Sequence, residues 1–182
     1  MAVRSKKAVS KKNVARKPAK KKQIKKKVHF IPKGFHTLTP YLSVHDGKAA
    51  VEFYEKAFGA KERKGRMSDE KGKIMHTEIK IGVSHFMLSD EFPEYGNVSP
   101  KTVGKSPVQL MIYVPNVDIL FEKAIAAGAT VVMAVEDQFY GDRSGRLLDP
   151  FGYQWHIATH MENVSPKEMA RRAAKLYGAQ AS

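Results

Sequence analysis

The sequence contains no cysteine and no long apolar run. The absence of cysteine from the 182 residues excludes disulfide frameworks, thiolate zinc sites and cysteine nucleophiles, and it fits a reducing compartment. No stretch approaches the roughly 20 apolar residues needed to span a bilayer, and no apolar signal region stands near the start. We therefore expect a soluble, cytoplasmic protein without a membrane span.

Acidic residues are missing from one end of the chain. Residues 1–34 hold 14 of the 32 Lys and Arg residues and none of the 18 Asp and Glu residues, so residues 35–182 carry no net formal charge. Such a segment cannot bury enough apolar surface to offset the entropy lost on ordering, and its like charges repel each other. We interpret residues 1–34 as a disordered Lys-rich arm. It would contact nucleic acid or another anionic surface, or else serve only to keep the chain in solution.

Several familiar catalytic motifs are also missing. There is no Ser-His-Asp elbow, no Walker loop and no dinucleotide-binding fingerprint. The Gly-Asp-Arg-Ser-Gly run at residues 141–145 is not a phosphate loop, because no strand-to-helix transition follows it. Nucleophilic and nucleotide-dependent chemistry therefore rank low.

What is present is a strand and helix pattern that occurs twice. In the first half, alternating apolar residues predict a strand that ends near Val44, and a helix follows between a capping Asp46 and a terminating Gly59. The second half repeats this order, with a helix that ends at Gly128. The later strands are expected at 61–67, 73–81 and 84–90 in the first half and at 130–137, 143–148 and 153–159 in the second. The repeat constrains about 125 residues together, which no single motif does.

The repeat predicts an α+β fold. Two tandem β-α-β-β-β modules would form curved mixed sheets with helices outside. A capping box at residues 165–168 predicts a C-terminal helix packed on the domain or on a second subunit. The expected segments are a disordered arm (1–34), a first module (35–90), a connecting loop (91–106), a second module (107–160) and a C-terminal helix (161–182).

The residues of these modules resemble a known superfamily. The run Phe-Tyr-Glu-Lys-Ala-Phe-Gly at 53–59 and the run Asp-Pro-Phe-Gly-Tyr at 149–153 resemble the vicinal oxygen chelate superfamily of glyoxalases, bleomycin resistance proteins and extradiol dioxygenases. The run at 141–145, Met-Leu-Ser-Asp at 87–90 and Trp155 resemble its PhnB-like branch. The resemblance covers roughly residues 35–160 and implies two half-barrels around a cleft, commonly with a metal, in a homodimer.

The resemblance also implies positions for a metal site. Metal-dependent members place four ligands on the concave face, and the matching positions here are Thr39, Met87, Gln109 and His156. Of these, only His156 is a common ligand for Zn²⁺, Ni²⁺ or Fe²⁺, and the expected carboxylates are absent. An alternative metal site combines His156 with His76 and Glu78, and this two-His-one-carboxylate set could take Zn, Ni, Fe or Mn. The other interpretation is that His76 and Glu78 occupy surface or rim positions.

Without a metal, we interpret the concave face as a pocket for a small organic ligand. Met and aromatic walls with a few polar groups suit an aromatic or cationic molecule. The expected lining residues are Thr39, Tyr41, Met87, Gln109, Met111, Tyr113, Gln154 and His156, with Arg143 at the mouth. Two alternatives stay open: the face could pack against another module or subunit, and Arg143 could be a salt-bridged turn residue.

We therefore favour a small-molecule-binding protein with a degraded metal site, no resident cofactor and no catalytic activity. One alternative is a metal-dependent lyase or dioxygenase of the same superfamily. The other is a polyanion-binding protein that acts through its basic arm.

Overall fold

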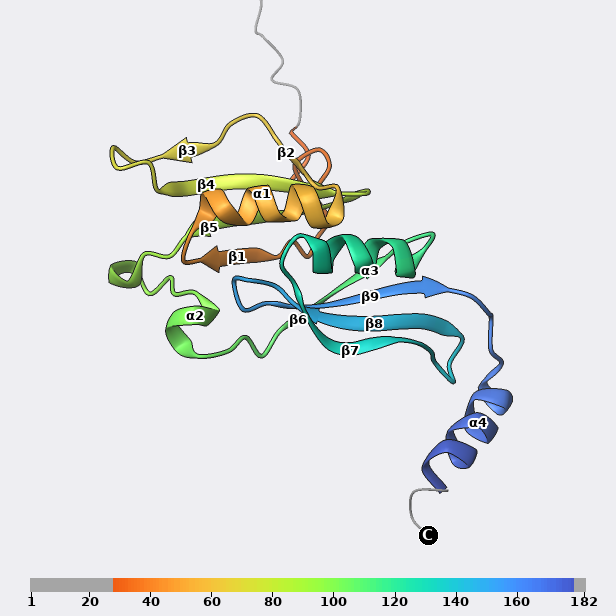
Figure 1. Cartoon of the computed structure of the whole chain (residues 1–182). Helices are drawn as coiled ribbons and strands as arrows, with labels where there is room; N and C mark the ends of the chain where they lie inside the picture. Colours follow the sequence, from red (N-terminus) through yellow and green to blue (C-terminus); the bar gives the residue numbers. More distant parts are fainter. Residues whose placement is uncertain (1–27, 179–182) are drawn as a thin grey trace, which may run out of the picture. The chain divides into compact units, whose positions relative to one another are not determined.

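The computed structural model describes residues 28–178 of the chain (Figure 1). Residues 1–27, which make up most of the expected basic arm, lie outside the described residues, as do residues 179–182. By its contacts the chain divides into residues 1–30 and residues 31–182. The helices and strands reported below all belong to the second unit.

The first module contains one helix and five strands. The sheet order is β1-β5-β4-β2, with β3 paired to β4; β1 and β5 are parallel and the other pairs antiparallel. The elements are β1 (Tyr41–Val44), α1 (Gly47–Phe58), β2 (Lys61–Glu62), β3 (Met67–Ser68), β4 (Ile74–Ile81) and β5 (Ser84–Asp90).

One expected strand of this module is divided. The sequence predicted a continuous strand over residues 61–67, whereas the structure has the short strands β2 and β3. Gly65 between them has φ of 116°, a conformation that L-residues in strands do not adopt. The pairing of β3 with β4 is also irregular between Met67 and Ser68.

Two short helices interrupt the segment that was expected to be a loop. They are η1 (Pro93–Tyr95), a single 3₁₀ turn, and α2 (Pro100–Val103). Ser99 caps α2 through its side-chain oxygen, and a proline stands at the first helical position of each.

The second module repeats the order of the first. Its sheet has the order β6-β9-β8-β7, with β6 and β9 parallel and the other pairs antiparallel. The elements are β6 (Gln109–Tyr113), α3 (Val117–Ala126), β7 (Thr130–Asp137), β8 (Asp142–Leu148) and β9 (Gln154–His160). The predicted fold of two mixed sheets with helices outside is confirmed.

Equivalent caps start the two long helices. Asp46 accepts a hydrogen bond from the amide of Ala49 at 2.9 Å, and Asn116 accepts one from the amide of Ile119 at 3.0 Å. The predicted terminator Gly59 has φ of 62° and closes α1. The helices therefore begin in the same way in both modules.

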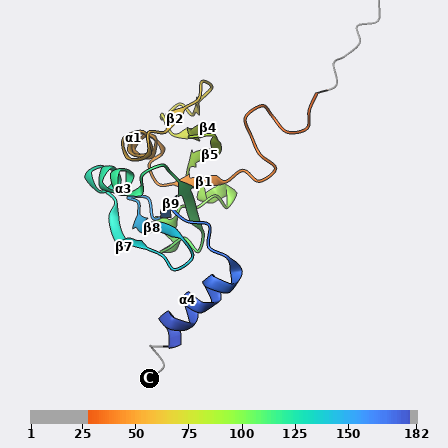
Figure 2. The same ribbon diagram turned by 90° about the vertical axis from the view of Figure 1, so that its right-hand side faces the viewer.

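The two modules share one hydrophobic core. Helices α1 and α3 lie side by side on the same side of the two sheets (Figures 1 and 2). The ring centroids of Tyr54 and Phe58 from α1 lie 5.4 Å and 4.7 Å from that of Trp155 in β9. All three side chains are buried, so the aromatic cluster joins the first module to the second.

The carboxylate of Asp149 lies at this junction. It accepts hydrogen bonds from the Tyr54 hydroxyl and the Trp155 indole N–H, both at 2.8 Å, and from the amides of Phe151 and Tyr153, both at 2.9 Å. Burial raises the pKa of Asp149, while these four hydrogen bonds act in the opposite direction. The Asp-Pro-Phe-Gly-Tyr run therefore has a structural role in holding the two modules together.

The C-terminal helix α4 (Pro166–Gly178) contacts the turn between β7 and β8. Arg172 forms an ion pair with Glu162 at 2.8 Å, and the Tyr177 ring lies 6.0 Å from that of Phe139. No residue of α4 is buried. Within residues 28–178, no helix has both the length and the apolar character needed to cross a membrane.

Candidate ligand-binding faces of the two sheets

Each sheet has a helix side and an open side, which faces away from α1 and α3. Along β9, Trp155 and Ile157 are buried on the helix side, whereas Gln154 and His156 are on the open side and partly exposed. This is the alternation that the sequence predicted for the strand. The open sides are where the sequence placed the ligand cleft.

On the first module, one row of the open side crosses three strands. Tyr41 of β1 pairs in register with Met87 of β5, which pairs with Glu78 of β4. The Tyr41 hydroxyl lies 3.3 Å from His76 Nδ1, and His76 Nε2 lies 4.0 Å from Glu78 Oε1. Glu78 is also paired with Arg63. The titratable groups of this face are therefore partnered within the module.

Thr39 lies outside this row. It precedes β1, and its hydroxyl donates to the carbonyl oxygen of His36 at 3.0 Å. Thr39 therefore belongs to the segment that leads into the sheet.

On the second module, the equivalent row is Met111 of β6, His156 of β9 and Arg146 of β8. Parallel rows flank it on both sides. One contains Gln109 and Gln154, and the other contains Tyr113, Ala158 and Ser144. Gln109, Met111, Tyr113, Gln154 and His156, all expected in the cleft, therefore lie together.

A chain of hydrogen bonds closes one end of this face. The Tyr113 hydroxyl donates to Asp142 Oδ2 at 3.0 Å, and Asp142 Oδ1 lies 2.7 Å from His160 Nδ1. The hydrogen bond to Asp142 raises the pKa of Tyr113 and is also the main cause of the raised pKa of His160. Asp142 itself is buried, with 5% of its surface exposed. Both of its carboxylate oxygens therefore already have hydrogen-bond partners within the module.

His156 has no such carboxylate partner among the described residues. Partial burial lowers the pKa of His156, the positive charge of Arg146 lowers it further, and Asp142 opposes both effects. The lowered pKa favours the neutral form of the imidazole. Its Nε2 atom is buried and has no hydrogen-bond partner within residues 28–178.

Arg143 lies on the other side of the sheet. Its guanidinium forms ion pairs with Asp118 of α3 at 2.7 Å and with Asp137 at 3.1 Å. The structure therefore places Arg143 on the helix side, away from the mouth of the expected cleft. The arginine on the open side is Arg146, which the sequence analysis missed. The parity of β8 could have identified it, because Arg143 and buried Leu147 share one side while Arg146 lies on the other.

The residues present do not fit a metal centre in one chain. The row positions Met87 and Met111 offer soft sulfur, and Gln109 offers a weak oxygen ligand. His76 and Glu78 lie in the first sheet, whereas His156 lies in the second. Within residues 28–178, no group of three or more His, Asp or Glu side chains is arranged so that it could hold a metal ion.

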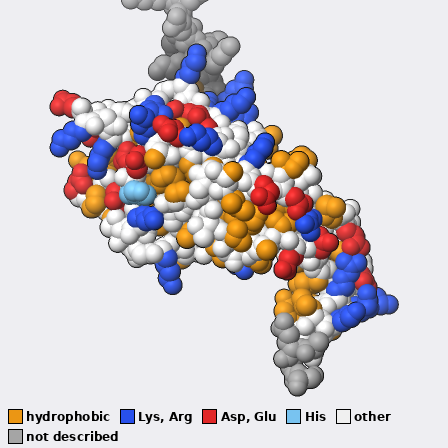
Figure 3. Space-filling model, in the orientation of Figure 1, with side chains coloured by type: hydrophobic (Ala, Val, Ile, Leu, Met, Phe, Trp, Pro, Cys, Tyr) orange, Lys and Arg blue, Asp and Glu red, His pale blue; other side chains and the backbone are white. Residues whose placement is uncertain are grey.

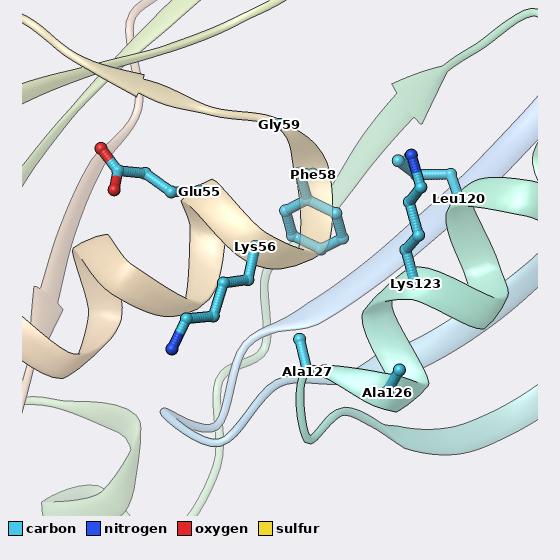
Figure 4. A pocket seen from close by; sticks show the side chains of 8 residues that line it. All are labelled: Glu55, Lys56, Phe58, Gly59, Leu120, Lys123, Ala126 and Ala127. Atoms are coloured by element: carbon cyan, nitrogen blue, oxygen red, sulfur yellow. The ribbon is translucent and has the colours of Figure 1, made fainter.

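The described part of the chain also has grooves that differ from the expected cleft. One, of about 490 Å³, lies between α1 and α3 and is lined by Lys56, Phe58, Leu120 and Lys123 among others (Figure 4). Hydrophobic side chains gather in the middle of the face drawn in Figure 3, which has the orientation of Figure 1. None of the expected cleft residues lines this groove.

The second groove, of about 370 Å³, lies between the edge strands β1 and β6 and the connecting segment. Tyr41 and Tyr153 line it. The Tyr153 hydroxyl donates to the carbonyl of Ser43 at 3.0 Å and accepts from the Ser43 amide at 3.1 Å. Tyr153 therefore occupies the free edge of β1, which protects that edge from pairing with another strand.

The comparison with known families now identifies the fold. The model of the Glyoxalase/Bleomycin resistance protein/Dioxygenase superfamily matches residues 34–157. The chain belongs to this superfamily. An uncharacterized protein from Mycobacterium tuberculosis (strain ATCC 25618 / H37Rv) is 39% identical over 135 residues, which are 72% of this chain and 79% of that protein. An uncharacterized protein of Arabidopsis thaliana is 30% identical over 115 residues, which are 60% of this chain and 69% of that protein.

Solved structures with the superfamily fold agree. TioX from Micromonospora sp. ML1 matches with a TM-score of 0.54 and 25% identity, over 68% of this chain and 98% of TioX. An Arabidopsis thaliana gene product matches with a TM-score of 0.54 and 29% identity, over 68% of this chain and 98% of its own. The PhnB protein of Bacillus cereus, at 18% identity and a TM-score of 0.51 over 68% of this chain and 99% of PhnB, shows the same fold.

Proposed function

We propose that this superfamily member binds a small organic molecule on the open side of its sheets, without a metal. The observation that carries the proposal is the make-up of the second open face. Met111 and Tyr113 are 46% and 60% exposed there, beside the unpartnered Nε2 atom of His156. Exposed aromatic and Met side chains around a few polar groups are typical of small-molecule sites.

A screen of small aromatic molecules by thermal shift, followed by NMR titration, tests the proposal. We expect saturable binding that His156→Ala and Tyr113→Ala weaken. Tyr95→Ala is the matched control, because Tyr95 is 83% exposed but lies in η1 of the connecting segment. Binding that is equally insensitive to all three substitutions would contradict a site on the open face.

The exposed open faces also support a homodimer. Tyr41 and Met67 of the first module are 49% and 56% exposed, and exposed apolar side chains on such a face favour association. A second copy could cover these side chains and enclose the ligand site. Analytical ultracentrifugation of the full chain should then give twice the monomer mass of 20.4 kDa, and a monomer at micromolar concentration would count against the dimer.

The metal-dependent lyase or dioxygenase is the second candidate function, and its donor set is poor. Of the three residues expected to hold the metal, His156 lies on the second open face, while His76 and Glu78 lie in the other sheet. Metal analysis by plasma mass spectrometry, on protein purified without chelator, separates the two candidates. Stoichiometric metal that His156→Ala removes would favour the enzyme, and background metal in both proteins would favour the binding protein.

The composition of residues 1–34 supports a separate polyanion contact. These residues carry 14 Lys and Arg and no acidic residue, so binding to DNA should weaken steeply as salt increases. Deletion of residues 1–30 should abolish that binding and leave small-molecule binding unchanged. Retention of DNA binding after the deletion would contradict a role for the arm.

A further inference from the structure

The second open face carries a positive charge that forms no ion pair with a carboxylate of residues 28–178. Residues 28–178 contain six arginines. Five of them form ion pairs with Asp or Glu, namely Arg63, Arg66, Arg143, Arg171 and Arg172. Arg146 is the sixth, and its guanidinium donates to Met133 Sδ at 3.6 Å and to no carboxylate among the described residues.

The lack of a carboxylate partner in the described part of the chain matters because Arg146 lies within the sheet face. Arg146 is only partly exposed and pairs in register with His156 and with Met133. Partial loss of hydration costs a guanidinium free energy. This cost is not offset unless a carboxylate or another anion binds it. The equivalent position of the first module is occupied by Glu78, which is balanced by Arg63.

Two polar atoms beside Arg146 also lack partners. Ser144, the next residue on the same side of β8, is 0% exposed, and its hydroxyl has no hydrogen-bond partner within residues 28–178. His156 Nε2, in the row of Arg146, is likewise buried and unpartnered. Buried polar groups are almost always hydrogen-bonded, so two such groups next to one unbalanced cation indicate a site for a polar ligand group.

The nearby acidic residues do not neutralise Arg146. Asp142 is engaged by the Tyr113 hydroxyl and by His160. Glu136, opposite Ser144 on the edge strand β7, is exposed and forms no ion pair in the described part of the chain. Arg146 is therefore left without an ion-pair partner among the described residues and can accept an anionic group.

We propose that Arg146, His156 and Ser144 bind the carboxylate of an organic ligand whose apolar body rests on Met111 and Tyr113. This inference rests on the proposed small-molecule function and names the class of ligand. The guanidinium can donate two parallel hydrogen bonds to one carboxylate, which no neutral ligand group matches in strength. In this proposal the Ser144 hydroxyl and the His156 imidazole, from the adjacent row and the same row as Arg146, donate to the same carboxylate. An anionic ligand replaces the cationic one that the sequence analysis considered.

Matched pairs of acids and amides test the inference. Naphthoate and naphthamide, indoleacetate and indoleacetamide, and phenylpropionate and phenylpropionamide share their apolar bodies and differ in charge. In NMR titrations of the full chain, we expect each acid to bind about tenfold more tightly than its amide, or better. The amide signals of Ser144, Arg146 and His156 should shift with the acids.

Two arginine variants provide the matched comparison. Arg146→Gln should remove the preference for the acid, and Arg146→Lys should keep part of it, because the charge remains without the planar fork. Arg143→Gln, on the helix side of the same strand, should leave the preference unchanged. Circular dichroism of each variant confirms that it is folded.

The remaining outcomes separate this inference from the proposed function. If acids and amides bind equally and Tyr113→Ala weakens both, the carboxylate site is overturned and small-molecule binding stands. If none of the probes binds, both are overturned. If Arg146→Gln instead dissociates a dimer and leaves acid binding unchanged, Arg146 pairs with a second copy and the inference is wrong.

Discussion

The two modules have the same fold and the same contacts on the helix side, but their open sides differ. In the first, Asp90 accepts from the Gly47 amide at 2.8 Å, and in the second, Thr159 accepts from the Val117 amide at 2.8 Å. In both cases a residue of the module's central strand anchors the first turn of its helix. On the open sides, Glu78 is balanced by Arg63, whereas its counterpart Arg146 has no carboxylate partner in the part of the chain that the structure describes.

This difference separates what the fold requires from what it permits. A contact that both modules make, with different residue types, serves the common fold. An unbalanced group that only one module carries has no role in that fold, and it reduces stability unless a ligand approaches it. The comparison therefore predicts large stability effects on the helix side and small ones on the open side.

The largest effect is expected at the junction that joins the modules. Asp149→Ala leaves the Tyr54 hydroxyl, the Trp155 indole and two amides without an acceptor, and should lower the free energy of unfolding by about 3–5 kcal/mol. Urea unfolding followed by circular dichroism measures the change. Asp137→Ala is the control, since the side chain of Asp137 is 83% exposed, and should cost less than about 0.5 kcal/mol. Equal costs for the two substitutions would show that the junction does not depend on Asp149.

The next effect tests the anchors that the modules share. Asp90 accepts from the Gly47 amide and, at 2.6 Å, from the Ile74 amide, so Asp90→Ala should lower the free energy of unfolding by about 2–3 kcal/mol. Thr159→Val, which removes one accepted and one donated hydrogen bond, should cost about 1–2 kcal/mol. The same unfolding measurement gives both values. If only one of the two substitutions lowers the free energy of unfolding, the two anchors are not equivalent.

A smaller effect is expected at the two row positions that carry charge. Glu78→Gln removes a partly exposed ion pair and should lower the free energy of unfolding by less than about 1 kcal/mol. Arg146→Gln removes a charge without a partner and should leave stability unchanged or raise it by up to about 1 kcal/mol. Thermal unfolding of the two variants in one buffer makes the comparison. A clear loss of stability in Arg146→Gln would mean that Arg146 supports the fold and is not held for a ligand.

Sequence periodicity was sufficient for the order of the main helix and strands of each module and for the sides of those strands. The alternation in β9 placed Trp155 inside and His156 on the open side, as the structure has them. Periodicity failed at residues 61–67, where Gly65 has φ of 116° and divides the strand. The alternation of apolar residues does not report that a glycine leaves the extended region of backbone conformation.

The candidate site was predictable only in part. The sequence analysis placed Arg143 at the mouth of the cleft, although the parity of β8 assigns the open side to Arg146. Parity also put His76 and His156 on open sides, but it does not report that they belong to different sheets. The unpartnered Ser144 hydroxyl could not be predicted at all, because a missing partner becomes visible only when every neighbour has been placed.

The smallest effect concerns two histidines on the same face of β9. Burial and the charge of Arg146 lower the pKa of His156 below its ordinary value of 6.5, whereas the hydrogen bond to Asp142 raises the pKa of His160 above that value. His160 therefore contributes stability below about pH 6.5, and this contribution is lost as the pH rises through its raised pKa. His156 acts in the opposite sense: its contribution is present above about pH 6.5 and is lost as the pH falls through its lowered pKa.

NMR titration of the histidine side chains can separate the causes of these two shifts. Arg146→Gln should raise the pKa of His156, because it removes the neighbouring positive charge and leaves the burial, and it should have little effect on His160. Asp142→Asn should lower the pKa of His160, because the carboxylate is the main cause of its shift. If Arg146→Gln does not change the titration of His156, the guanidinium does not act on that imidazole, and the two side chains cannot serve one carboxylate together. A raised pKa for His156 in the variant would place the unbalanced charge of the second module next to its unpartnered nitrogen.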